Sequence, residues 1–444
     1  MNINKAKISL LFVGDIAILY LSLFLTILIR YGFADLKEKW VDHLLPFTIV
    51  FLAWLLVFYL FELYSPKAFK SKFDLLKMSS GAILISFLIS IVTFYTFGSF
   101  FSLSPKTNLI IFTIIFGLVN FSWRAFLQNI FLSKKWIIKV LAIGNSPVFL
   151  ETLESIKKNP SLGYRIEREV VNNFGEQSVT ELVDFSKRSG VEIIVLDRTA
   201  AKEKATSKLA YDLLPSGIQT KNFIDFYEEI FKKIPLEELG EKWFIREINT
   251  SNKLNTAIKR IIDFALALAF SIILLPVNIV IAVLIKITSR GPALFKQTRV
   301  SRQGKFFTLY KWRTMVKDAE KDGAKWAEKR DSRITKIGRF LRHTHLDEMP
   351  QLWNILRGDI SFVGPRPERP EFTEKLREEI PHYEMRHIVK PGLTGWAQIS
   401  YRYGATVEDA AKKLEYDLYY LKNRSLTLDI LTILKTIKMI FKNH

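Results

Sequence analysis

Four long apolar runs before residue 135 constrain the fold of this chain more than any other feature. They cover residues 8–29, 45–64, 79–98 and 108–131. Each is close to the roughly 20 residues that a helix needs to cross a bilayer. Four buried helices of a soluble core are the alternative, which so many runs of this length disfavour. The runs therefore predict a four-helix transmembrane domain over residues 1–134.

Basic residues flank these runs unevenly. Lys5 and Lys7 precede the first run, and Lys134 and Lys135 follow the fourth. The loop between the second and third runs carries Lys67, Lys70, Lys72 and Lys77. The positive-inside rule places the N-terminus, this loop and everything after residue 134 in the cytoplasm.

The overall charge suggests the kind of partner. The formal net charge is +20 over 444 residues, which implies an anionic partner, and the 35 phenylalanines favour a membrane surface. Much of the excess charge flanks apolar segments, so lipid explains it better than nucleic acid. The absence of cysteine excludes disulfides and thiolate metal sites and fits a protein that faces the cytosol.

Residues 135–250 have the alternating strand and helix signals of a small α/β domain. Strand-like runs occur at Ile137–Ile143 and Val191–Leu196, and the first leads into Gly144-Asn145-Ser146. This turn is Rossmann-like or CoA-binding-like, but it has one glycine where a dinucleotide site uses three. We expect a structural or regulatory domain.

A fifth apolar run, Ile261–Ile287, contains Pro276 near its middle. Proline inside a helix removes a hydrogen bond and bends the helix. Basic residues lie at both ends of the run, which argues against crossing the membrane. We expect a re-entrant helix–break–helix hairpin over about residues 259–288, within a third domain at 251–444. A kinked fifth span is the alternative.

The most informative motif is Leu346–Pro367, LDEMPQLWNILRGDISFVGPRP. Asp347 and Glu348 precede Met349-Pro350, and proline favours a first helical turn. We therefore expect Asp347 at a helix N-terminus, a position that attracts anions. With Arg366 fixed between prolines, the pattern suits phosphoryl chemistry in which a metal reconciles carboxylate and phosphate. A simple Asp cap beside a solvated Glu is the alternative.

Further cations flank this motif. Lys311 and Arg313 alternate with apolar residues at strand spacing and should share one face, where they suit a diphosphate or form a solvated edge. Residues 335–346 form a short basic amphipathic pattern, which suits either an anionic membrane interface or an ordinary surface helix. The loop at 390–398 could hold Thr394, Trp396 and Gln398 against a ligand.

The last 190 residues or so resemble the bacterial sugar transferases, which are the monotopic phosphoglycosyl transferases. The first 250 residues resemble the long form of that family. The shared elements occur in order: Lys259-Arg260 with Asp263, Pro276, GPALFKQTR, LYKWRTM, LDEMPQL, GDISFVGPRP and RHIVKPGLTGWAQ. The resemblance implies a membrane protein of α plus α/β class. Its parts would be a four-helix transmembrane domain, a Rossmann-like domain, and a mostly helical catalytic domain with a re-entrant hairpin.

The resemblance also implies a two-step reaction at the cytoplasmic face of the bacterial inner membrane. Asp347 would attack the β-phosphate of a nucleotide-diphosphate sugar, usually UDP-linked, and expel UMP. Undecaprenyl phosphate would then accept the sugar phosphate. The product would initiate synthesis of an exopolysaccharide, capsule or O-antigen.

Roles for individual residues follow from the same resemblance. Glu348 would help hold Mg²⁺, and Lys311, Arg342 and Arg366 would contact phosphates. Lys259 and Arg260 would meet lipid headgroups or the lipid phosphate. The remaining residues expected at the site are Arg313, Gln351, Arg386, Thr394 and Gln398 near substrate, and Asp263 and Pro276 near the membrane.

Two positions depart from the usual pattern of the family. Leu275 stands where many members have serine, and Trp312 stands where phenylalanine is commoner. Neither removes a proposed catalytic group. The sequence does not indicate which sugar is transferred, and it allows a homodimer. A non-catalytic membrane scaffold for polysaccharide assembly is the alternative, against which the intact acidic pair and arginines speak.

Overall fold

The computed structural model describes residues 3–64, 72–98, 106–131, 137–171, 176–248, 253–316, 319, 333–401, 404 and 406–442. The chain divides into two compact units, Met1–Phe223 and Ile224–His444. Lys67, Lys70, Lys134 and Lys135, on which the predicted orientation partly rests, lie outside the described residues.

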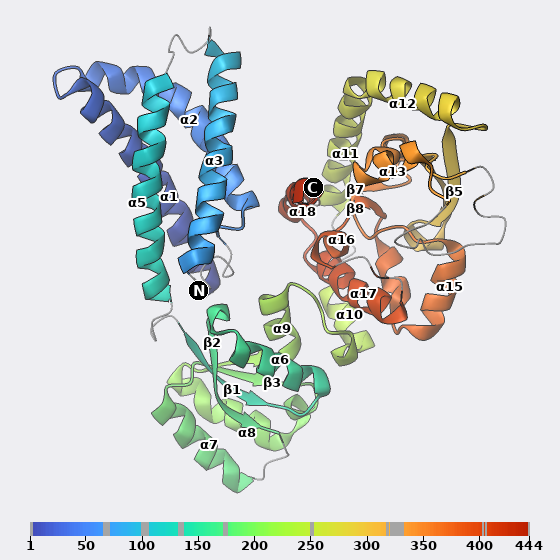
Figure 1. Ribbon diagram of the computed structural model, residues 1–444. Helices are drawn as coiled ribbons and strands as arrows, with labels where there is room; N and C mark the ends of the chain where they lie inside the picture. Colours follow the sequence, from blue (N-terminus) through green and yellow to red (C-terminus); the bar gives the residue numbers. More distant parts are fainter. Residues whose placement is uncertain are drawn as a thin grey trace. The chain divides into compact units, whose positions relative to one another are not determined.

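Four helices of the first unit are long and apolar enough to cross a membrane (Figure 1). They are α1 (Ile3–Tyr31), α2 (Leu36–Leu60), α3 (Lys72–Thr96) and α5 (Lys106–Phe131). The structure therefore confirms the four predicted apolar helices. The second begins nine residues before its apolar run because the polar segment from Leu36 continues the helical backbone.

An aromatic core holds this bundle together. Phe47 and Trp54 of α2 pack edge-on against Phe112 of α5, and all three rings are fully buried. Side by side with this core lies a buried charge pair, in which Arg124 Nη2 of α5 donates to Asp15 Oδ2 of α1 at 2.5 Å. Polar groups in a bilayer need such internal partners because lipid offers none.

The rest of the first unit contains a four-stranded parallel sheet with strand order β2-β1-β3-β4 (Figure 1). Its strands are β1 (Ile138–Ile143), β2 (Tyr164–Val170), β3 (Ile193–Leu196) and β4 (Gln219–Asn222). The connecting elements are α6 (Pro147–Lys158), η3 (Pro160–Leu162), α7 (Glu176–Ser189), η4 (Ala200–Lys202), α8 (Lys204–Leu213) and η5 (Leu214–Ser216). This order is that of a doubly wound fold, and β1 and β3 are the two strands expected from the sequence.

The second unit is mostly helical. Its strands form an antiparallel pair, β5 (Leu294–Val300) with β6 (Phe306–Trp312), and a parallel pair, β7 (Ser361–Val363) with β8 (Gly392–Thr394). Its helices are α9 (Phe223–Phe231), α10 (Glu241–Glu247), α11 (Lys253–Ile273), α12 (Leu275–Thr288), α13 (Lys336–His343), α14 (Gln351–Arg357), α15 (Pro370–Glu379), α16 (Trp396–Ser400), α17 (Val407–Lys422) and α18 (Leu426–Lys442). Short 3₁₀ helices lie at η6 (Leu236–Glu238), η7 (Arg302–Gly304), η8 (Leu346–Glu348) and η9 (Tyr383–Ile388).

Part of the segment before residue 250 packs with the second unit. Ile234, Trp243 and Phe244 share one buried cluster with Leu414 and Leu418 of α17. These apolar side chains therefore belong to the core of the second unit, together with Ile224 and Leu239.

The predicted break in the fifth apolar run is present. Helices α11 and α12 meet at an angle of 61° around Leu274, and Pro276 lies in the first turn of α12. Proline is well tolerated there because first-turn N–H groups have no helical acceptor. Most apolar side chains of both helices point outward, including Phe270, Leu275 and Val280, which are 43%, 55% and 56% exposed.

Candidate functional site

Glu348 is the centre of a cluster of charges in the second unit. Its Oε1 accepts from Lys311 Nζ of β6 at 2.6 Å and from Arg366 Nη2 at 3.3 Å. Burial alone would raise the pKa of this carboxyl, but Lys311 and Arg366 together lower it to about 2. Glu348 is therefore ionised at neutral pH, and it gathers two of the cations that the sequence assigned to phosphate binding.

Asp347 lies beside Glu348 but in a different environment. It is buried, and among the described residues none donates a hydrogen bond to its carboxylate. Burial raises its pKa, and Glu348 adds to this effect, while Lys311 and Arg342 oppose it. The Asp347 carboxylate is thus shielded from water and close to cations, and its oxygens accept no hydrogen bond from the described residues. Such an environment suits a nucleophile.

The local backbone differs in one respect from the sequence prediction. Asp347 lies in the 3₁₀ turn η8, whereas α14 begins at Gln351 with Pro350 as its N-cap residue. The turn starts at His345, whose backbone is left-handed at φ 56°. Asp347 therefore precedes the helix by one turn and does not cap it.

Helix α13 brings Arg342 toward this turn. Thr335 caps the helix by accepting from Gly338 N at 2.9 Å, and Arg342 Nε donates to Thr314 Oγ1 at 2.8 Å. A Cβ on Gly338 would lie 2.0 Å from Thr314 O, so only glycine permits this approach. The segment after β6 thus fixes the position of the helix that carries Arg342.

Arg366 is held by the backbone of its loop. Gly364 N donates to Thr394 O at 3.0 Å, and a Cβ on Gly364 would lie 2.4 Å from Lys390 O, so this crossing requires glycine. Arg386 Nη2 donates to Arg366 O at 3.1 Å. Arg386 therefore acts on Arg366 through its carbonyl.

Arg386 itself is buried in an internal network. It pairs with Asp417 of α17 at 2.8 Å and donates to Tyr383 Oη at 2.6 Å. Burial raises the pKa of Asp417 to about 6 although Arg386 opposes the shift. Asp417 carried no motif signal, because a single acid in an ordinary helical pattern looks like a surface residue.

The other residues expected near substrate are mostly enclosed. Arg313 is 7% exposed and donates to Ser289 O at 2.8 Å, whereas Lys311 donates to Glu348. Thr394 Oγ1 lies 2.7 Å from Thr436 Oγ1, and Gln398 Nε2 lies 3.5 Å from Leu393 O. Gln351 is buried at the start of α14. Their predicted contacts with substrate stay predictions.

The predicted membrane residues have internal partners as well. Lys259 Nζ pairs with Asp429 Oδ2 at 2.5 Å, and Arg260 donates to the carbonyls at the end of α14, at 2.5 and 2.6 Å. Asp263 accepts from Ser361 Oγ at 2.7 Å. These side chains attach α11 to the catalytic fold, and their predicted contact with a lipid phosphate stays a prediction.

Trp396 lies in the core. Its indole donates to Lys232 O at 2.9 Å and stacks on Tyr419 with ring centroids 5.5 Å apart. It is therefore not available to stack on a base or sugar.

Mg²⁺ at this site stays a prediction. Within the described ranges, no group of three or more histidine or acidic side chains is arranged to hold a metal. Mg²⁺ commonly binds through one or two carboxylates and completes its coordination with water and substrate phosphates. Glu348, next to Asp347, is the carboxylate that would serve in this mode, and its Oε1 is paired with Lys311 and Arg366 in this structure.

In the parallel-sheet domain, the side chain of Asp197 occupies the turn after β1 where phosphate would bind. One oxygen of Asp197 accepts from the backbone N–H groups of Asn145 and Ser146 at 2.8 and 3.2 Å. The other accepts from Thr199 N and Ala200 N at 3.0 and 2.8 Å. A carboxylate therefore occupies the turn where a dinucleotide pyrophosphate would bind.

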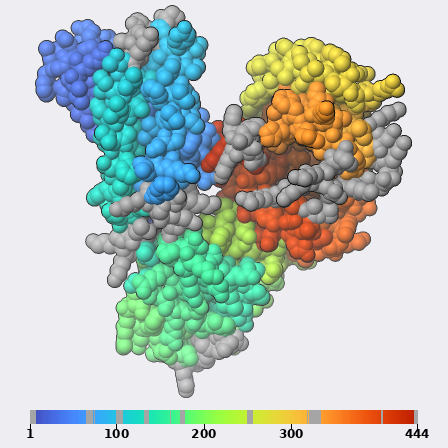
Figure 2. Space-filling view, in the orientation of Figure 1, coloured from blue at the N-terminus to red at the C-terminus, as the bar shows by residue number. Residues whose placement is uncertain are grey.

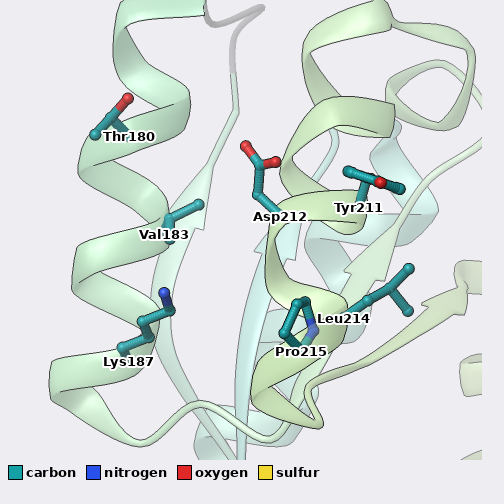
Figure 3. A pocket seen from close by; sticks show the side chains of 7 residues that line it. All are labelled: Thr180, Val183, Lys187, Tyr211, Asp212, Leu214 and Pro215. Atoms are coloured by element: carbon teal, nitrogen blue, oxygen red, sulfur yellow. The ribbon is translucent and has the colours of Figure 1, made fainter.

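A groove of about 550 Å³ lies elsewhere on this domain, between α7 and α8 (Figure 3). Its lining residues are Thr180, Val183, Lys187, Tyr211, Asp212, Leu214 and Pro215. None of them belongs to the turn at Asp197 or to the charge cluster of Glu348. The groove therefore adds nothing to the candidate site.

Comparison with known proteins places this geometry in context. The family model for bacterial sugar transferases matches residues 254–443. A UDP-N-acetylgalactosamine-undecaprenyl-phosphate N-acetylgalactosaminephosphotransferase of Aeromonas hydrophila is 44% identical over 183 residues, which cover 41% of this chain and 43% of that protein. A UDP-glucose:undecaprenyl-phosphate glucose-1-phosphate transferase of Klebsiella pneumoniae is 31% identical over 317 residues, 67% of each chain.

A protein of Escherichia coli with the same name as the Klebsiella relative is 32% identical over 301 residues, 66% of this chain and 65% of its own. The chain thus spans less than half of the Aeromonas relative and about two thirds of the other two. The charge cluster of Asp347 and Glu348 lies within residues 254–443, which the family model matches.

Proposed function

Because this chain belongs to the bacterial sugar transferase family, we propose that it moves a sugar-1-phosphate from a UDP-sugar to undecaprenyl phosphate. The products are UMP and undecaprenyl-diphosphate-sugar, an initiating intermediate of an exopolysaccharide, capsule or O-antigen. The observation that carries the proposal is the pairing of a buried, uncommitted Asp347 with Glu348, which binds Lys311 and Arg366.

The reaction proceeds in two displacements at phosphorus. An Asp347 carboxylate oxygen attacks the β-phosphorus, the bond from this phosphorus to the bridging oxygen breaks, and UMP leaves with the electron pair. A phosphate oxygen of undecaprenyl phosphate then attacks the phosphoryl aspartate. The bond between phosphorus and the aspartate oxygen breaks, and the free carboxylate returns. A carboxylate nucleophile divides one difficult transfer into two easier ones.

The cations around the site stabilise the charge that both steps share. Lys311 and Arg366, now paired with Glu348, reach the diphosphate, and Arg342 approaches from α13. Glu348 would hold Mg²⁺, which neutralises phosphate oxygens when it is bound. Lys311 and Arg366 already pair with Glu348, so its carboxylate would have to release at least one of them to hold the metal.

The bent pair α11–α12 supports a re-entrant hairpin. Its exposed apolar faces favour insertion into one leaflet, and the basic residues at both ends favour a return to the cytoplasmic side. Helix α13 would lie at the same interface through Phe340, which is 59% exposed among basic neighbours. The catalytic unit would thus meet nucleotide-sugars at the inner face of the inner membrane. A homodimer stays a prediction from the sequence.

The decisive experiment follows UMP release by the full chain in nanodiscs with undecaprenyl phosphate and Mg²⁺. A panel should include UDP-glucose and UDP-N-acetylgalactosamine, since the named relatives use both sugars. We expect UMP and a lipid-linked sugar with at least one donor, no turnover in EDTA, and recovery on adding Mg²⁺. Release of UDP in place of UMP, or no product with any donor, would contradict the proposal.

The membrane topology is tested with single cysteines, because the natural chain has none. We expect Ala257→Cys and Arg290→Cys, at the two ends of the hairpin, to react with an impermeant maleimide only in inside-out vesicles. Phe33→Cys, between α1 and α2 and 81% exposed, should react only in right-side-out vesicles. Labelling of Arg290→Cys from the outside would show a fifth span instead.

A further inference from the structure

Three consecutive residues at the end of β6 hold three different parts of the catalytic unit. Lys311 Nζ donates to Glu348 Oε1 at 2.6 Å. Trp312 Nε1 donates to Asn278 Oδ1 at 3.2 Å, in the first turns of α12, and Arg313 Nη2 donates to Ser289 O at 2.8 Å, at the end of α12. The end of β6 and the residue after it therefore contact Glu348 and both ends of α12, the second helix of the apolar hairpin.

Asn278 closes the break between the two apolar helices. Its backbone N–H and its side-chain Nδ2 both donate to Leu274 O, at 2.9 and 3.0 Å. With Nδ2 engaged at the break, Oδ1 needs a donor, because an amide oxygen without one is costly beside apolar surface. The indole of Trp312 supplies that donor.

Trp312 is equally dependent on Asn278. Its ring is 9% exposed and packs in one cluster with Ile281 and Ile285 of α12 and Leu341 of α13. A buried indole N–H requires an acceptor, and Asn278 Oδ1 is the one it has. Figure 2 shows α12 in yellow against α13 in orange, so the cluster joins the hairpin to the helix that carries Arg342.

We propose that the Trp312–Asn278 hydrogen bond is a positioning contact that couples the hairpin in the membrane to the catalytic carboxylates. When the depth or the angle of the helix break changes, the hydrogen bond to Asn278 shifts Trp312. The adjacent Lys311 then shifts relative to Glu348. The inference rests on the proposed transferase function and adds two positioning residues and a dependence on the bilayer.

The test is a double-mutant cycle of Trp312→Phe and Asn278→Leu in nanodiscs of two acyl-chain lengths. Phenylalanine keeps the ring in its cluster and removes only the donor; leucine matches asparagine in size and removes the acceptor. Each single variant leaves one buried polar group unpaired, whereas the double variant removes both. We expect each single variant to lower kcat by about 3- to 10-fold with little change in KM for the UDP-sugar.

The double variant should lose no more activity than either single variant. In all three variants, the ratio of kcat between thick and thin bilayers should move toward one, because the hairpin no longer pulls on β6. Trp243→Phe is the matched control: this tryptophan is buried in the same unit, and its Nε1 has no hydrogen-bond partner among the described residues. It should retain the kcat and the bilayer dependence of the natural protein.

Two results would overturn the inference. Wild-type kcat and bilayer dependence in Trp312→Phe would show that the contact does not reach the site. A lower Tm with unchanged kcat would show that it only supports the fold. Failure of the natural protein itself to release UMP would instead reject the proposed function, so the two failures are distinguishable.

Discussion

Asp347→Asn is expected to abolish sugar-phosphate transfer, with kcat reduced by about 10³-fold or more. The amide keeps the size of the side chain, but it is a far weaker nucleophile than a carboxylate and cannot form the phosphoryl intermediate. With a UDP-sugar labelled at the β-phosphate and no acceptor, the natural protein should retain the label and release one equivalent of UMP. The variant should do neither.

Glu378→Gln is a suitable control, because this acid is exposed on α15, outside the charge cluster of Glu348, and its loss should leave both readouts unchanged. Full UMP release by Asp347→Asn in the presence of undecaprenyl phosphate would reject the nucleophile. If the intermediate were absent in the natural protein and the kinetics were ordered, Asp347 would instead act as a base in a single displacement.

The same first step has an expected pH dependence. Because burial raises the pKa of Asp347 above its ordinary 3.8, the carboxylate loses nucleophilicity as the pH falls through that raised value. Glu348, with a pKa of about 2, stays ionised over this range and contributes no second inflection. The rate of UMP release without acceptor should therefore show one acid limb above pH 3.8. A limb below that value would contradict the assignment.

The largest stability effect is expected in the transmembrane bundle. Arg124→Leu or Asp15→Leu leaves one fully buried charge without its partner, which typically costs about 3–5 kcal/mol. The double variant removes both charges and should recover most of the loss. Recovery should be incomplete, because Arg124 also donates to Asn120 Oδ1 at 3.0 Å and to Leu63 O at 2.8 Å.

Tryptophan fluorescence of the detergent-solubilised chain, followed through thermal unfolding, measures this effect. Asp42→Asn is the matched control, since its side chain is 43% exposed at the end of the bundle and should change Tm little. Additive losses in the double variant would show that the charges contribute through separate contacts and not as a pair.

The local pattern of the sequence determined the secondary structure and the chemistry. The length of the apolar runs predicted the four apolar helices, because any helix that crosses a bilayer requires about 20 apolar residues. Strand-like runs predicted β1 and β3, Pro276 predicted the helix break, and the order of the motifs identified the family. The cause of each helix, strand and break lies within a short segment of the chain.

The tertiary structure decided what each charged residue touches. Lys311 and Arg313 look equivalent in the sequence, yet one reaches Glu348 and the other turns to Ser289 O. Arg386 acts through the carbonyl of Arg366, and Trp312 reaches Asn278, 34 residues earlier. Ile234, Trp243 and Phe244 join the core of the second unit for the same reason. Such partners depend on how distant segments pack, because a buried polar or apolar group is stabilised only by what the fold places next to it.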